Sequence, residues 1–374
     1  MIDTVRKADN IPRLEARGFP APLAAGLAKE HLPSLDGVRA IAAFLVVFFH
    51  AGLPLPGSLG VLAFFVLSGF LITWLLLREE ERYGAVSLKQ FYVRRSLRIF
   101  PAFYVYWLVV VGTLLLLHKR LVIAQAICSF FYLNDYYQAI FGDPNTGLSH
   151  TWSLGVEEQF YLIWPVVFIL LGANRRRIRF LAWAIAATVA YREALVFVFR
   201  LHQGYTYEAF DARADHLMIG CLLAVVLRER AALGVWQRIC VSPVLVWVTV
   251  ALLCVSGALT VAYGANYRDT LGSVADPILV AILLVQTITW PAEGVGAALN
   301  WRWMRYLGAI SYSIYLYQQI VVGEMEKVAR PWPWLRLPVI VAGVIAAASF
   351  SYWVVERPAL SLRGRFGRPR HAVV

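Results

Sequence analysis

Long apolar segments separated by short charged loops dominate the chain. Leu59 to Leu77 contains nineteen residues without a charge, and Pro243 to Tyr263 contains twenty-one. Segments of about 20 apolar residues match the roughly 30 Å hydrocarbon core of a bilayer. The pattern predicts an all-α, polytopic integral membrane protein with about ten transmembrane helices, at residues 38–53, 59–77, 98–118, 153–171, 180–199, 213–227, 243–263, 274–291, 306–322 and 335–355.

Three further segments complete the predicted organisation. The apolar run from Leu121 to Leu133 is too short to span comfortably, so a re-entrant or interfacial segment is expected there. Residues 1–33 mix charges with prolines and contain no apolar signal-peptide region, which predicts a cytoplasmic N-terminal arm. A transmembrane domain is expected over residues 34–360, followed by a basic cytoplasmic tail over residues 361–374.

The loops differ in positive charge. Lysine and arginine gather in the N-terminal arm, in the loops after the second, fourth, sixth and eighth predicted spans, and in the tail. In a ten-span topology all of these segments fall on one side, and cytoplasmic loops of membrane proteins carry this excess. We therefore expect both termini in the cytoplasm and the chain in the inner (plasma) membrane.

The composition agrees with a membrane protein and limits the classes of partner that the protein is expected to bind. Hydrophobic residues make up 60% of the 374 positions and charged residues 16%, against about 45–50% and about 25% in soluble domains. The net charge of +12 follows from the loop bias and from attraction to anionic membrane lipids, so no nucleic-acid partner is expected. The cysteines show no metal-ligand or redox spacing, so no metal site is expected. They are Cys128, Cys221, Cys240 and Cys254.

Ionisable residues at membrane depth are costly and are therefore functional candidates. Arg39 and His50 are eleven residues apart, which is three helical turns plus about 20°. One helix face therefore carries both, separated by roughly 16 Å along the axis, and can line an internal channel. The alternative is a histidine that only hydrogen-bonds a neighbouring helix.

Two later spans open with charged or aromatic motifs. Arg95 and Arg98 are neighbours on a helix, and guanidinium pairs suit phosphate groups. The alternative is positive-inside charge alone. His150, Trp152 and the adjacent carboxylates of Glu157 and Glu158 lie at a predicted outer membrane boundary. Carboxylates there need partners or a water-filled cavity, although Trp152 also fits an interfacial aromatic belt and the glutamates a helix cap.

Other polar residues inside the predicted spans are expected to stabilise the packing of helices. Arg192 and Glu193 are expected to pair with each other or across helices. Gln318 and Gln319 sit in a hydroxyl-rich span, where amides commonly join neighbouring helices.

Several of these motifs together resemble the acyltransferase-3 family of membrane-bound acyltransferases. The resemblance runs from Leu32 to about Leu362. The matching segments are LDGVRAIAAFLVVFFH from Leu35, FFVLSGFLIT from Phe64, FYVRRSLRIFP from Phe91, HTWSLGVEEQFYLIWP from His150, RADHLMIGCLLA from Arg213, ISYSIYL from Ile310, and VERP from Val355.

The resemblance implies a ten-helix O-acyltransferase that moves an acyl group, expected to be acetyl, from cytoplasmic acyl-CoA to a hydroxyl of an extracytoplasmic or lipid-linked glycan. Acceptors in such a family include lipopolysaccharide, exopolysaccharide and peptidoglycan. Acyl-CoA is then the donor substrate, and the glycan and the membrane lipids are the other partners. Some members carry a fused extracytoplasmic hydrolase-like domain, which is not expected here.

The resemblance also implies roles for residues. By the resemblance, His50 is the essential histidine and Arg39 shares its motif. The mechanism that we expect uses His50 as general base, with a covalent acyl relay on His50 or Ser68 as the alternative. Glu157 or Glu158 is expected to orient His50 or to bind sugar hydroxyls. The expected catalytic residues are His50, Glu158 and Arg39, and the expected substrate-binding residues are Arg95, Arg98, Trp152, His150, Glu157, Asp36, Ser68 and Arg213. Gln318 stands where the family often has histidine, which puts a titrating role there in doubt.

A transporter or flippase is the main rival reading, because a ten-span protein with internal charges fits that class too. No inverted repeat is apparent in the sequence, and the family motifs favour the enzyme. Hydrolysis of acyl-CoA by the purified protein would separate the two classes.

Overall fold

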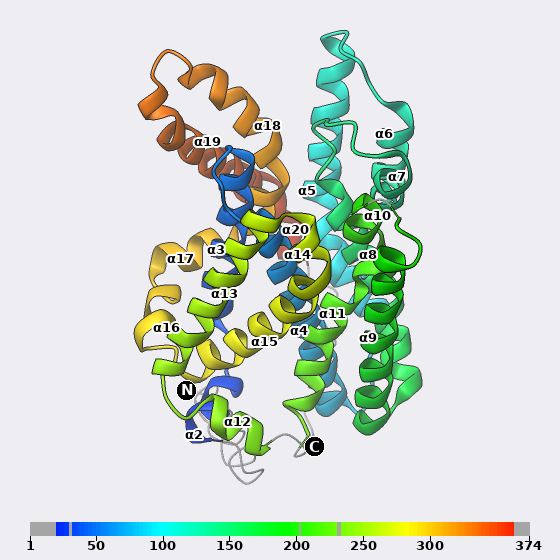
Figure 1. Cartoon of the computed structure of the whole chain (residues 1–374), viewed down its shortest axis with the longest axis vertical. Coiled ribbons are helices and arrows are strands. Elements are labelled where there is room, and N and C mark those ends of the chain that lie inside the picture. The colour runs from blue at the N-terminus through cyan, green and yellow to red at the C-terminus, as the bar shows by residue number, and fades with distance from the viewer. Residues whose placement is uncertain (1–19, 30–31, 202, 230–232, 363–374) are drawn as a thin grey trace. The chain divides into compact units, whose positions relative to one another are not determined.

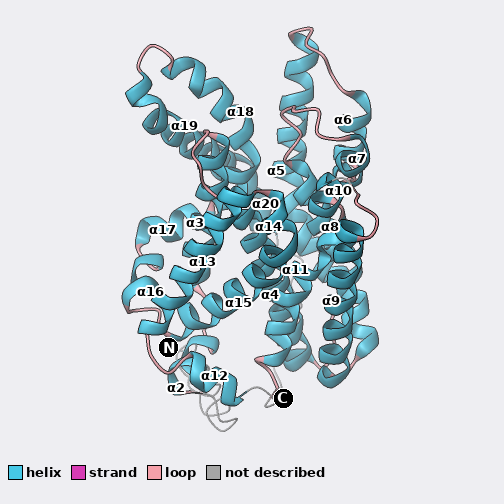
Figure 2. Cartoon of the chain, viewed as in Figure 1, coloured by secondary structure: helices cyan, strands magenta, loops and turns pink. Residues whose placement is uncertain are grey.

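A computed structural model describes residues 20–29, 32–201, 203–229 and 233–362 of the chain. Within these residues the secondary structure is helical, and none of them lies in a strand (Figure 2). The all-α prediction is therefore confirmed for the described part of the chain. Residues 1–19 and 30–31 of the predicted arm, and residues 363–374 of the predicted tail, lie outside it.

Eight helical segments of the described chain are long and apolar enough to cross a bilayer. They are Pro33–His50, Gly57–Tyr83, Leu88–Leu116, Thr151–Leu171, Asn174–Phe197, Val244–Tyr263, Ala265–Thr289 and Pro333–Ser361. Each corresponds to one predicted span, so the chain is a polytopic membrane protein.

The other two predicted spans are helices that carry several charged residues near one end. Helix α11 (Phe210–Val226) has 17 residues and carries Asp211, Arg213 and Asp215 near its start. Helix α18 (Ser311–Ala329) carries three charged side chains near its end, Glu324, Glu326 and Lys327. Charges near a helix end shorten the apolar part, so the number ten stays a prediction.

The chain folds into two compact units, each built from segments distant in sequence. Unit 1 comprises residues 1–74 and 171–311. Its elements (Figure 1) are α2 (Ala21–Leu27), α3 (Pro33–His50), the first part of α4 (Gly57–Tyr83), α9 (Asn174–Phe197), α10 (Gln203–Glu208), α11, α12 (Leu233–Ile239), α13 (Val244–Tyr263), α14 (Ala265–Tyr267), the π-helical turn η2 (Arg268–Gly272), α15 (Ser273–Thr289), α16 (Gly294–Leu299) and α17 (Arg302–Ala309).

Unit 2 comprises residues 75–170 and 312–374. Its elements are the end of α4, α5 (Leu88–Leu116), α6 (Ile123–Phe130), α7 (Asn134–Phe141), α8 (Thr151–Leu171), nearly all of α18, the 3-10 turn η3 (Pro333–Leu335), α19 (Arg336–Ser351), the π-helical turn η4 (Tyr352–Glu356) and α20 (Arg357–Ser361). The predicted transmembrane domain over 34–360 thus contributes to both units.

Glycines bring helix backbones of unit 1 into close contact. A Cβ at Gly220 of α11 would lie 2.0 Å from the carbonyl oxygen of Val66 in α4, and one at Gly69 of α4 would lie 1.9 Å from that of Leu217. A Cβ at Gly308 of α17 would lie 2.0 Å from the carbonyl oxygen of Asp36 in α3. Small residues at such crossings are the usual means by which membrane helices pack closely.

Part of the predicted N-terminal arm is a packed helix. Leu23 and Ala24 of α2 are fully buried, and α2 packs against α15. A Cβ at Gly26 would lie 2.4 Å from the carbonyl oxygen of Ile288. Residues 21–27 therefore form a helix that packs on α15, a helix far away in sequence.

Candidate functional site

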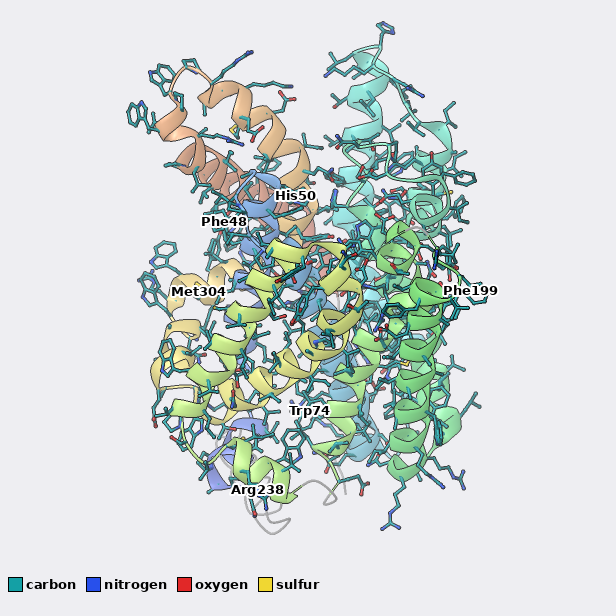
Figure 3. The ribbon with its side chains drawn as sticks, in the orientation of Figure 1. Phe48, His50, Trp74, Phe199, Arg238 and Met304 are labelled. Atoms are coloured by element: carbon teal, nitrogen blue, oxygen red, sulfur yellow. The ribbon has the colours of Figure 1, made fainter. Side chains whose placement is uncertain are left out.

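Helix α3 of unit 1 carries both Arg39 and His50 on one uninterrupted helix. Pro33 stands at its first position, where the fixed φ of proline suits a helix start. His50 is the last residue of α3, and its side chain is exposed (Figure 3). The placement of the two residues on one helix face is as predicted.

The imidazole of His50 has a defined orientation. Its Nδ1 lies 2.9 Å from the carbonyl oxygen of Val46, one turn earlier in α3. A carbonyl oxygen only accepts, so Nδ1 donates and Nε2 carries the lone pair. The ring of Phe49 contacts that of His50 edge-on, with centroids 5.3 Å apart. This arrangement presents Nε2 as the basic nitrogen.

The other predicted residues of α3 lie in its first two turns. Arg39 is half-buried, and its Nε is a buried donor without a hydrogen-bond partner among the described residues. Asp36 is half-exposed, and its backbone packs against Gly308. An unsatisfied guanidinium nitrogen is costly in a protein interior, so Arg39 is suited to bind a polar ligand.

Ser68 and Arg213 belong to the neighbouring helices α4 and α11. Ser68 is half-buried and precedes Gly69, which packs on α11. Arg213 is 1% exposed, and its guanidinium lies 4.8 Å from the centroid of the Tyr207 ring. Arg213 is therefore part of a buried charged cluster and does not face the surface of the chain.

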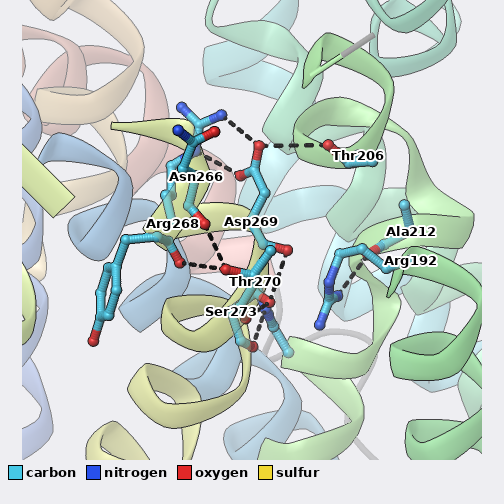
Figure 4. A network of polar contacts seen from close by, with 10 residues as sticks. Arg192, Thr206, Ala212, Asn266, Arg268, Asp269, Thr270 and Ser273 are labelled. Atoms are coloured by element: carbon cyan, nitrogen blue, oxygen red, sulfur yellow. Dashed lines mark hydrogen bonds and ion pairs between the residues drawn. The ribbon is translucent and has the colours of Figure 1, made fainter. Parts of the chain in front are cut away.

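That cluster joins four elements of unit 1 (Figure 4). Arg192 of α9 donates to Asp215 at 2.9 Å and to the carbonyl oxygen of Ala212 at 2.8 Å, and both side chains of the ion pair are fully buried. Arg268 makes two bonds to the neighbouring Asp269, at 2.6 and 2.8 Å. Of the two predicted arrangements for Arg192, the pairing across helices is thus the one observed.

In unit 2, His150 precedes α8 and is joined to α18. Its backbone N–H and its Nδ1 both lie within hydrogen-bond distance of Gln319 Oε1, at 3.1 and 2.6 Å. The hydroxyl of Tyr315 donates to the His150 carbonyl oxygen at 3.2 Å and lies 2.5 Å from Ser153 Oγ. The amide oxygen of Gln319 accepts from Nδ1 and so fixes the tautomer of His150.

Glu158 lies deeper than the sequence suggested. It is the eighth residue of α8, about 10 Å along the axis from Thr151. Arg95 of α5 is close enough to Glu158 to interact electrostatically, and its guanidinium lies 3.7 Å from the centroid of the Tyr161 ring. Glu158 Oε1 and Arg95 Nε are both buried without a hydrogen-bond partner among the described residues. These atoms form a polar site inside unit 2.

The remaining predicted residues of unit 2 lie on the same two helices, α5 and α8. Trp152 is only 7% exposed, so it is not part of an exposed interfacial belt. Glu157 and Arg98 are half-buried. The structure thus brings Arg95 and Glu158 together within unit 2 and Arg39 and His50 onto one helix of unit 1.

Sequence reasoning did not assign Tyr161, Tyr132 or Gln319 to the site. Tyr161 lies within the matching segment that begins at His150, and Gln319 lies in the hydroxyl-rich span. Only the fold shows that they contact Arg95 and His150. Tyr132 lies in the short apolar segment after α5, and Glu158 is close enough to interact with it electrostatically. The sequence signal for Tyr132 is a hydroxyl in a mostly apolar run that also contains Ser129, and this signal is too weak to use alone.

Comparisons with known proteins agree with these motifs. The chain is 30% identical over 358 residues to a protein named peptidoglycan O-acetyltransferase OatA from Listeria monocytogenes serovar 1/2a, covering 88% of this chain and 56% of the relative. It is also 30% identical over 354 residues to the putative peptidoglycan O-acetyltransferase YrhL of Bacillus subtilis, covering 88% and 55%.

A putative O-acetyltransferase of Staphylococcus aureus is 28% identical over 357 residues, with 88% and 57% covered. The chain therefore spans a little over half the length of these relatives. No solved structure matches the chain significantly. Residues 32–356 match the family described as an acyltransferase domain. On this match over most of its length, the chain belongs to the acyltransferase-3 family.

Proposed function

We propose that the protein is a membrane-bound O-acetyltransferase that moves an acetyl group from cytoplasmic acetyl-CoA to a hydroxyl of an extracytoplasmic or lipid-linked glycan. The names of the relatives make peptidoglycan the first acceptor to test. The observation that carries the proposal is the geometry of α3, where His50 presents Nε2 on the helix face that also carries Arg39. The proposal places the chain in the inner membrane with both termini in the cytoplasm.

The proposed chemistry is direct transfer with His50 as general base. Nε2 of His50 takes the proton of the acceptor hydroxyl while the hydroxyl oxygen attacks the thioester carbonyl carbon. The bond from that carbon to sulfur breaks, the acetyl group remains on the acceptor as an ester, and the CoA thiolate takes up a proton. Histidine suits this work because its ordinary pKa lies near neutral pH.

The proposed donor site uses the arginines at the start of α5. Replacing Arg95 and Arg98 together with alanine is expected to weaken acetyl-CoA binding by roughly ten- to a hundredfold for each arginine, since charge-assisted bonds contribute about 1.5–3 kcal/mol each. Binding of radiolabelled acetyl-CoA to purified protein measures this. Arg94→Ala is the matched control, because Arg94 already pairs with Glu79 at 2.7 Å.

If the double variant binds acetyl-CoA as well as the unchanged protein does, the arginines do not hold the donor. Arg95 would then act through its neighbour Glu158, and Arg98 would reflect only the charge bias of the loops. The Arg94→Ala control separates either result from a general loss of positive charge at this helix start.

The proposed acceptor site centres on Glu158, with His150, Trp152 and Glu157 nearby in sequence. Carboxylates accept hydrogen bonds from sugar hydroxyls, and indole rings stack on the apolar faces of sugars. Glu158→Gln is expected to lose transfer to the glycan while acetyl-CoA binding stays intact, because the amide keeps the size but loses the charge. Parallel assays of both half-reactions test this, and lost acetyl-CoA binding with normal expression would refute an acceptor role.

A further inference from the structure

The connection between α5 and α8 has an unusual composition for a loop. Residues 121–142 contain one charged side chain, Asp135, and that side chain is fully buried. Two eight-residue helices, α6 and α7, make up most of the segment. Each is about 12 Å long, too short to span a bilayer, and neither is among the eight candidate spans.

The two helices have polar side chains inside and apolar side chains outside. Asn134 donates to the Leu148 carbonyl oxygen at 3.0 Å, and Gln138 donates to that of Ser149 at 2.8 Å. The outward side chains are large and apolar, with exposed fractions of 53–74%. They are Ile123, Ile127, Phe131, Ile140 and Phe141. Exposing these large apolar side chains to water would be unfavourable in free energy. Lipid acyl chains favour apolar side chains outside and hydrogen-bonded polar groups inside.

Helix α6 runs back along α5 from its end (Figure 1). Trp107 Nε1 donates to the carbonyl oxygen of Ala126 at 3.0 Å, and the Tyr104 hydroxyl donates to that of Phe130 at 3.3 Å. Tyr104 lies twelve residues before Leu116, the end of α5, which corresponds to roughly 18 Å along the helix. The end of α6 is therefore well inside the length of a candidate transmembrane helix.

The contacts of Tyr132, in the turn between α6 and α7, also place this turn well inside the lengths of α5 and α8. The ring of Tyr132 stacks on that of Phe103 in α5, with centroids 4.3 Å apart. In α8, Gln159 Nε2 donates to the Tyr132 carbonyl oxygen at 3.0 Å. Gln159 lies eight residues after Thr151, which is roughly 12 Å into α8. Both flanking helices place this turn near the middle of a hydrocarbon core about 30 Å thick.

We propose that residues 121–142 form a re-entrant hairpin that enters the bilayer from one side, turns near its middle and returns, with lipid acyl chains covering its outward apolar face. That face continues the lipid-facing surface of α5, where Leu108 is 63% exposed. Irregular backbone at membrane depth is tolerated only where protein covers it, and the bond from Gln159 meets this condition at Tyr132. The inference does not depend on the enzymatic activity.

Cysteine accessibility tests the hairpin. Single cysteines are placed at Phe131 and at Ile127 in a chain whose four native cysteines are replaced. In the variants that keep one native cysteine, the other three are replaced. Lys119→Cys is the water-exposed control, and native Cys254, exposed on the candidate span α13, is the lipid-facing control. In membranes opened to reagent from both sides, a charged maleimide is expected to label position 131 at least tenfold more slowly than position 119. Native Cys128 on α6, kept alone, provides a variant with no substitution near the turn.

Fluorescence quenching identifies what covers the face. A fluorophore attached at position 131 by a membrane-permeant maleimide is expected to be quenched more by lipids with a nitroxide deep in the acyl chain than by lipids with a nitroxide near the headgroup. Labelling at 131 as fast as at 119 would overturn the proposal. So would stronger quenching at the headgroup level, which indicates an interfacial segment, or no quenching at either level, which indicates cover by protein.

Discussion

Replacing His50 with alanine is expected to lower the rate of acetyl transfer by about 10²–10⁴-fold, the usual cost of losing a general base. The side chain is exposed at the end of α3, and its Nδ1 bonds to the Val46 carbonyl oxygen one turn earlier in the same helix. Its removal therefore leaves the helix core intact, and expression and thermal stability should stay close to those of the unchanged protein. Turnover of acetyl-CoA with a glycan acceptor measures the effect.

Two variants serve as controls for this substitution. His118 is an exposed histidine at the end of α5 with a positive φ of 50°. His118→Asn, a replacement that tolerates this backbone, should transfer acetyl groups normally. Ile41→Ala removes an exposed side chain of α3 itself, and it should also be active. Near-normal turnover by His50→Ala would rule out the base that we propose.

The second large effect is on stability. Arg192→Met is expected to destabilise the protein by about 3–5 kcal/mol, because it leaves the carboxylate of Asp215 buried without its partner. The ion pair is fully buried at 2.9 Å. Unfolding of the detergent-solubilised protein, followed by tryptophan fluorescence, measures this. Arg176→Met is the matched control, since Arg176 is exposed on the same helix.

A double variant separates the ion pair from simple loss of packing. Combining Arg192→Met with Asp215→Leu removes both charges, so much of the lost stability should return, as happens when buried ion pairs are replaced by apolar residues. If the double variant is as unstable as the sum of the two single variants, the buried charge is not the cause. The lost stability would then come from other hydrogen-bond donors of the buried charged cluster that lose their partners.

Sequence periodicity and hydropathy predicted what depends on local composition. Every one of the eight long apolar helices was expected, because a span is encoded by its own residues. The face shared by Arg39 and His50 also follows from helix geometry alone. The packing of the short helix α2 on α15 does not follow from the sequence, because an apolar pattern over seven residues is too short to indicate a partner helix.

Contacts between distant segments could not be predicted in the same way. His150 and Gln319 are separated by 169 residues, and Arg192 and Asp215 belong to different helices. The sequence marks each as a polar residue in an apolar setting, but the partner is chosen by the packing of whole helices. For the same reason the composition of segment 121–133 fits both a re-entrant and an interfacial segment, and only the contacts of Tyr132 with α5 and α8 indicate its depth.

The central claim is acetyl transfer to a glycan hydroxyl with His50 as base. It is tested most directly by supplying isotope-labelled acetyl-CoA to the protein in proteoliposomes with peptidoglycan fragments or lipid-linked sugars, and detecting alkali-labile acetyl ester on the acceptor by mass spectrometry. The unchanged protein should form the labelled ester, and His50→Ala should form essentially none. Passage of the acceptor across the membrane without any acetyl ester would contradict the account and favour a transporter.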